Sequence, residues 1–141
     1  MKITTSLILV VSLINHLQAA LVEKVVTYQE GSTTLEGFHV YDDAVTGKRP
    51  AILIIHQWTG LSENEKGRGR MLAKLGYNVF AADIYGEGIR PAPAEAATEA
   101  GKYKTDRSLY RARLSAAVEV LKADERTETS KMAAIGYCFG G

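Results

Sequence analysis

Cysteine, histidine and proline are scarce in this chain of 141 residues, which also carries almost no net charge. Because Cys138 is the single cysteine, the chain can form neither an internal disulfide nor a zinc site built on several cysteines. A net charge of +1 gives no excess of positive charge of the kind that nucleic-acid-binding domains carry. No phosphate loop of the GxGxxG or Walker type follows a predicted strand, and no pattern indicates a metal or another cofactor. Hydrophobic residues make up 46% of the chain, which is enough for the core of one ordinary globular domain.

The N-terminus carries a short apolar run. Lys2 precedes the segment SLILVVSLI (6–14), and small residues follow at Ala19 and Ala20. These features predict a signal peptide over residues 1–20, followed by a domain over 21–141. An anchoring transmembrane helix is the alternative, but the run is about half of the roughly 20 residues that a bilayer needs. We therefore expect a secreted or periplasmic protein with no stable membrane association after cleavage.

The remaining sequence predicts an α/β fold. Segments 25–29 and 34–41 alternate around a glycine turn, which is typical of an antiparallel hairpin. Continuous apolar runs of strand length are typical of strands buried on both faces of a parallel sheet, and they lie at 51–55, 78–83 and 132–137. An amphipathic segment, 110–121, predicts a helix before the last run. The order indicates an α/β-hydrolase-type, mainly parallel sheet with an N-terminal antiparallel hairpin.

A capping box predicts another helix between the first two apolar runs. Ser62 and Glu65 open it, and Gly76 ends it. Gly67 and Gly69 are expected to weaken its middle. The side chains predicted to form its buried face are Met71, Leu72 and Leu75.

The segment GYCFG (136–140) predicts a nucleophile elbow with cysteine in the place of serine. A tight turn from strand to helix pushes one side chain out above the sheet, and flanking glycines let the two backbones approach. Cys138 would then lie at a helix N-terminus, where the dipole and free N–H groups favour a thiolate. The alternative is a buried structural cysteine beside incidental glycines.

The loop after the first apolar run, HQWTG (56–60), lies at the sheet edge where α/β proteins bind ligands. Trp58 is predicted to line a pocket, with simple packing as the alternative. His56 closes the strand and is interpreted as structural, since a base before the nucleophile would break the usual triad order. Asp83 is predicted to cap a loop rather than to bind a ribose or a phosphate.

Two stretches together resemble the dienelactone hydrolase family of α/β-hydrolases: HQWTGLSENEKGRGRMLAKLGYNVFAADIYGEGIRP and AAIGYCFGG. The resemblance runs from about Thr34 to Gly141. It implies that Cys138 is the nucleophile and that the backbone N–H groups of Phe139 and Trp58 form the oxyanion hole. It also implies hydrolysis of a small-molecule ester or lactone, often carrying a carboxylate, through a thioester acyl-enzyme.

The chain departs from that family's pattern near the predicted site. Members typically have a glutamate where Gln57 stands, and Gln57 can donate and accept hydrogen bonds but cannot take a proton. The family's arginine for a substrate carboxylate has no match in register, and Arg90 is the nearest substitute. Gln57, His56 and Arg90 are therefore predicted to lie in or just behind the pocket.

In that family an aspartate and a histidine follow the elbow, and this chain has neither there. The resemblance therefore implies an N-terminal fragment, truncated after the strand of the nucleophile elbow. The triad acid and base would lie beyond it, so we expect the chain alone to have little or no turnover.

Two other classes of function stay open. A non-catalytic ligand-binding protein of the same fold is favoured by Gln57. Thiol redox chemistry at Cys138 is the other, although the sequence supplies no second cysteine to resolve an oxidised thiol.

Overall fold

The computed structural model describes residues 20–141, so the predicted signal peptide lies outside the described residues except for Ala20. The elements follow in the order β1 (Leu21–Glu30), β2 (Thr33–Asp42), β3 (Arg49–Ile55), α1 (Glu63–Ala73), β4 (Asn78–Ala82), α2 (Pro93–Thr105), α3 (Arg107–Ala123), β5 (Thr127–Gly136) and a short 3₁₀ helix, Cys138–Gly140. In this part of the chain, no helix is both long and apolar enough to cross a membrane.

The five strands form one mixed sheet in the order β1-β2-β4-β3-β5. Strands β4, β3 and β5 run parallel, while β1 and β2 form an antiparallel hairpin that joins β4 in antiparallel pairing. The predicted α/β fold with an N-terminal hairpin is therefore confirmed.

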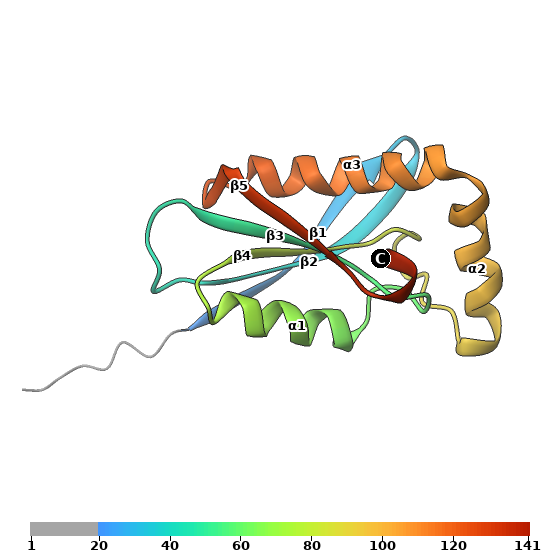
Figure 1. The fold of residues 1–141 in the computed structure, drawn as a ribbon, viewed down its shortest axis with the longest axis horizontal. Coiled ribbons are helices and arrows are strands. Elements are labelled where there is room, and N and C mark those ends of the chain that lie inside the picture. Colours follow the sequence, from blue (N-terminus) through green and yellow to red (C-terminus); the bar gives the residue numbers. More distant parts are fainter. Residues whose placement is uncertain (1–19) are drawn as a thin grey trace, which may run out of the picture.

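Helices cover both faces of this sheet. Figure 1 shows α3 along one face and α1 along the other, with α2 at the end where β3 and β5 finish. Each face has its own apolar core. On the α3 face it includes Leu35, Leu53, Phe80 and Leu121, and on the α1 face it includes Val40, Ile54, Val79 and Ala73. The continuous apolar sequence of β3 and β4 follows from this double coverage.

Helix α1 begins as predicted but buries a different face. The Ser62 backbone N–H donates to Glu65, and the Asn64 backbone N–H donates to the Ser62 hydroxyl, which confirms the capping box. Two of the three side chains predicted to be buried, Met71 and Leu75, are 58% and 73% exposed. The prediction fails because the buried face consists of small or hydrogen-bonded residues, Glu65, Gly69 and Ala73, which bring the helix close to the sheet.

Helix α2 has no counterpart in the predicted elements. Pro93 occupies its first turn, where a missing N–H costs nothing. Its buried residues are Ala96, Ala100 and Tyr103. Two alanines give little apolar periodicity, so the pattern did not reveal the helix. Helix α3 was predicted, and Ala117 and Leu121 on its apolar face are buried.

Strand β5 is parallel to β3, as predicted, but it is not buried on both faces. It lies at the edge of the sheet, where Ala133 and Ala134 are exposed and Met132 and Ile135 are half-buried. The strand also begins at Thr127, before the apolar run 132–137 that predicts it.

Candidate active site

The turn after β5 has the geometry of a nucleophile elbow. Cys138 is the one non-glycine residue among 20–141 with a positive φ, at 53°, and it is exposed. A Cβ atom on Gly136 would collide with the carbonyl group of Gly140, and one on Gly140 would lie 2.7 Å from the Ile55 carbonyl oxygen. Both glycines are therefore required by close backbone approach, as predicted. The alternative, a buried structural cysteine, is wrong.

The residue after the cysteine anchors this turn in a cluster of aromatic rings. Phe139 is buried, and its ring centroid lies 5.2 to 6.3 Å from those of four other rings: His56, Tyr85, Tyr103 and Tyr110. The rings come from the ends of β3 and β4 and from α2 and α3. The cluster therefore fixes the elbow against both neighbouring strand ends and both helices.

Tyrosine hydroxyls in this cluster hold the loops around Cys138. Tyr85 donates to the Trp58 carbonyl oxygen at 2.9 Å, and Tyr103 donates to the Tyr85 carbonyl oxygen at 3.1 Å. Tyr110 donates to the Phe139 carbonyl oxygen at 3.5 Å. Burial raises the pKa of all three hydroxyls, so they remain protonated donors at neutral pH. This role could not be predicted from the sequence, since no local pattern shows that these tyrosines meet.

Two backbone amides at this end of the sheet have no hydrogen-bond acceptor within residues 20–141. Among residues 20–141, no hydrogen bond uses the N–H of Trp58 or of Phe139. A tight turn positions the Trp58 amide, because the Gly60 N–H donates to the Gln57 carbonyl oxygen at 3.1 Å. The structure thus brings Trp58 and Phe139 to the same end of the sheet as Cys138.

His56 lies behind this site and is fully engaged. Its side chain is wholly buried, Nδ1 donates to the Gln57 carbonyl oxygen at 2.6 Å, and Nε2 accepts from the Ile84 N–H at 3.2 Å. Burial lowers its pKa, which keeps the ring neutral. Its ring stacks on Phe139 at 5.8 Å between centroids. The structural interpretation of His56 is therefore confirmed.

Arg90 is held by the loop that follows β4. It donates to Asp83 at 3.4 Å and to the carbonyl oxygens of Gly86 and Ile89 at 3.1 and 2.7 Å. Asp83 accepts from the backbone N–H groups of Glu36, Tyr85 and Gly86, which confirms that it caps a loop. Arg90 thus supports the β4 exit loop.

A cavity of about 370 Å³ opens beside the nucleophile. It is lined by Trp58, Tyr103, Lys104, Arg107, Tyr110, Cys138, Phe139 and Gly141. Trp58 therefore lines a pocket, as predicted, whereas Gln57, His56 and Arg90 are not among the lining residues. No histidine, aspartate or glutamate side chain is part of this lining. Lys104 and Arg107 were not anticipated, because they come from the unpredicted α2 and its junction with α3.

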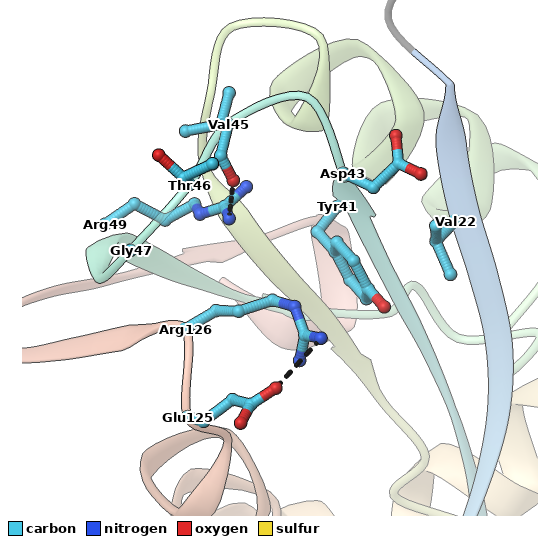
Figure 2. Close-up of a pocket in the computed structure, with 9 residues that line it drawn as sticks. All are labelled: Val22, Tyr41, Asp43, Val45, Thr46, Gly47, Arg49, Glu125 and Arg126. Atoms are coloured by element: carbon cyan, nitrogen blue, oxygen red, sulfur yellow. Dashed lines mark hydrogen bonds and ion pairs between the residues drawn. The ribbon is translucent and has the colours of Figure 1, made fainter.

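A second cavity, of about 520 Å³, lies at the opposite end of the sheet, where β3 begins (Figure 2). Arg49 donates to the carbonyl oxygens of Asp42 and Val45, and Arg126 pairs with Glu125 at 3.0 Å beneath the Tyr41 ring. These cations are thus engaged by the protein itself. Within residues 20–141, no cluster of three or more metal-ligating side chains is present.

Comparison with known proteins identifies the family. The family model for dienelactone hydrolases matches residues 35–141. The chain belongs to the dienelactone hydrolase family. This agrees with the resemblance carried by the two sequence stretches around Trp58 and Cys138.

The relatives that match this member of the dienelactone hydrolase family are longer than the chain itself. A dienelactone hydrolase-like promiscuous phosphotriesterase, P91, from metagenomic libraries is 35% identical with a TM-score of 0.83, covering 86% of this chain and 51% of P91. Protein usf of Aquifex pyrophilus is 34% identical over 100 residues, 65% of this chain and 42% of that protein. A dienelactone hydrolase from Anabaena variabilis, at 20% identity and a TM-score of 0.61 over 86% of this chain and 54% of its own, shares the fold. The chain thus spans about half the length of the solved relatives that it matches.

Proposed function

We propose that this protein hydrolyses small-molecule esters or lactones and that Cys138 is the nucleophile. One observation carries the proposal: an exposed cysteine with a φ of 53° opens into a cavity whose wall includes Trp58 and Phe139, the residues with free amides. A non-glycine residue held in this conformation costs about 1–3 kcal/mol, and such strain is concentrated at functional sites. Membership of the family supports the same chemistry.

The acylation step follows from this geometry. The Cys138 thiolate attacks the ester carbonyl carbon, and the carbonyl oxygen gains negative charge that the Trp58 and Phe139 N–H groups stabilise. Collapse of the tetrahedral intermediate breaks the bond to the alcohol oxygen, which leaves with a proton from solvent, and a thioester to Cys138 remains. Donors of this kind contribute about 10²–10³ in rate each.

Deacylation needs a base that the cavity lining does not provide. No histidine, aspartate or glutamate side chain lines it, and His56 uses both ring nitrogens within the protein. Gln57 cannot accept a proton. We therefore propose that the described residues carry acylation, while hydrolysis of the thioester by them alone is slow.

The test uses 4-nitrophenyl acetate and intact-protein mass spectrometry. The expected result is a burst of one equivalent of nitrophenol, little steady turnover, and an acetyl group on Cys138 alone. Cys138→Ala should show neither burst nor adduct, and because Cys138 is the single cysteine, thiol labelling is unambiguous. Saturable ester binding without an adduct would instead assign the chain to non-catalytic ligand-binding proteins, and the proposal would be wrong.

A further inference from the structure

A third cavity, of about 250 Å³, lies between the β1–β2 hairpin and the C-terminal end of α3. Its walls are apolar side chains of β1, β4 and α3, including Phe80 and Leu121, and two polar side chains, His39 and Asp124, complete the lining. Among the described residues, it shares no lining residue with the cavity at Cys138. An apolar wall with a few polar groups that converge on it is typical of a small-molecule site.

The hydrogen bonds around His39 decide which of its ring nitrogens carries the proton. The Thr127 hydroxyl donates to the Leu121 carbonyl oxygen at 2.6 Å, so its oxygen accepts from the Asn78 side-chain nitrogen at 2.9 Å. The same nitrogen donates to Asp124 at 3.1 Å. Because the Asn78 nitrogen is thus the donor, the Asn78 oxygen is the acceptor, and Nε2 of His39, at 2.7 Å from it, must carry the hydrogen. Burial lowers the pKa of His39 and keeps the ring neutral, so Nδ1 is an acceptor.

This acceptor has no donor. Among residues 20–141, Nδ1 of His39 takes part in no hydrogen bond, and Oδ2 of Asp124 lies 4.0 Å from it. A carboxylate oxygen is also an acceptor, so the two atoms adjoin with no hydrogen between them. The His39 side chain is 8% exposed, and leaving a buried acceptor unsatisfied is costly. Since both side chains line the cavity, a molecule inside it can supply the missing donor.

The spacing of these two acceptors decides which kind of donor fits. Arg126 donates to Oδ2 of Asp124 at 3.3 Å, which leaves this oxygen one further position for a hydrogen bond. An atom about 2.8 Å from both acceptors must direct two hydrogens toward them at roughly 90° to each other. A hydroxyl group has one hydrogen, whereas a primary ammonium group has three. Its positive charge also strengthens the hydrogen bond to a carboxylate.

We propose that this cavity binds a small primary amine with an apolar stem, whose ammonium group bridges Nδ1 of His39 and the Asp124 carboxylate. A dry protein cavity of about 150 Å³ holds benzene, so the volume here accommodates one aromatic ring with a short side arm. Phe80 and Leu121 contact the stem. The site goes beyond the proposed function and does not depend on it, because none of its groups takes part in the chemistry at Cys138.

The test compares three probes that share one ring and differ in the donor they carry: benzylamine, benzyl alcohol and toluene. Each is titrated at neutral pH into the full chain with ¹⁵N-labelled histidine, and the Nδ1 resonance of His39 is identified from its absence in His39→Gln. We expect benzylamine to shift that resonance saturably, because it donates to Nδ1, and to bind at least about fivefold more tightly than benzyl alcohol, since charge-assisted hydrogen bonds are stronger. Toluene should bind most weakly and leave Nδ1 unshifted.

A cavity-filling variant and a matched control locate the bound amine. Ala123 is exposed and lines the cavity, so Ala123→Phe fills the space without removing a core contact and should weaken benzylamine binding at least about tenfold. Ala97→Phe adds the same ring at an exposed position on α2 that is not part of this lining, and its affinity should equal that of the parent.

Three outcomes would overturn the proposal. Benzyl alcohol or toluene binding as tightly as benzylamine would mean that the cavity does not select an ammonium group. The absence of a saturable Nδ1 shift with benzylamine would leave water as the donor to His39. Undiminished binding in Ala123→Phe would mean that the amine binds elsewhere on the protein.

Discussion

At the scale of single residues, the two buried histidines stabilise the fold rather than supply a base. His39 donates from Nε2 to the Asn78 side-chain oxygen at 2.7 Å. Asn78 in turn donates to Thr127 at 2.9 Å and to Asp124 at 3.1 Å. This network ties β2 and β4 to the start of β5. Like His56, His39 is buried and neutral, so neither histidine is available to activate Cys138.

Burial of His39 makes the stability of the protein depend on pH. Burial lowers the pKa of His39 from the usual 6.5, and this effect outweighs the opposing effects of its hydrogen bond to Asn78 and of the Asp124 carboxylate. Just below pH 6.5 the unfolded state therefore binds more protons than the folded state, and folding loses free energy as the pH falls. We expect the free energy of unfolding in urea to decrease between pH 7.5 and 5.5, with a slope of at most about 1.4 kcal/mol per pH unit for each histidine. His39→Gln should flatten that slope, and parallel pH curves for parent and variant would contradict the explanation.

At the scale of elements, the sequence predicts the features that depend on residues close together in the chain. It does not predict the features that depend on contacts between distant residues. The hairpin, β3, β4, α3 and the elbow follow from periodicity, apolar runs and the spacing of Gly136, Cys138 and Gly140. Helix α2 was missed because two alanines on its buried face give a weak pattern. Lys104 and Arg107 were missed with it, since their approach to Cys138 depends on where α2 and α3 meet. The predicted buried face of α1 is wrong because small side chains, and not the most hydrophobic ones, face the sheet at Gly69 and Ala73.

Two glycines in α1 test that last point, because they differ in what surrounds them. A Cβ atom on Gly67 meets nothing within 4 Å, whereas one on Gly69 would lie 3.0 Å from Cγ1 of the buried Val40. Gly67→Ala should raise the free energy of unfolding by about 0.5–1 kcal/mol through helix propensity. Gly69→Ala should lower it by about 1 kcal/mol, because overpacking exceeds that gain. Urea titrations of both variants measure the difference, and an equal rise in both would mean that α1 does not depend on close approach at Gly69.

At the scale of the whole molecule, the two edges of the sheet are protected to different degrees. The edge strand β1 carries exposed charges at Glu23 and Lys24, which discourage pairing with another chain. At the other edge, β5 pairs with β3 and, among residues 20–141, with no other strand. Its last part, Met132–Gly136, has no charge and exposes Ala133 and Ala134. An uncharged edge of this kind is a template for pairing between copies.

We therefore expect the chain to self-associate through β5 as its concentration rises. Sedimentation velocity over a range of concentrations should show an increasing average sedimentation coefficient for the parent. Ala134→Lys should weaken the association at least about tenfold, because two such edges would bring like charges together at a cost of several kcal/mol. Ala97→Lys adds the same charge at an exposed position on α2 and should leave the association unchanged. If association persists in Ala134→Lys, another surface governs it. If association is lost equally in Ala97→Lys, overall charge governs it. Only a contact through the β5 edge would make the two lysines differ in their effect.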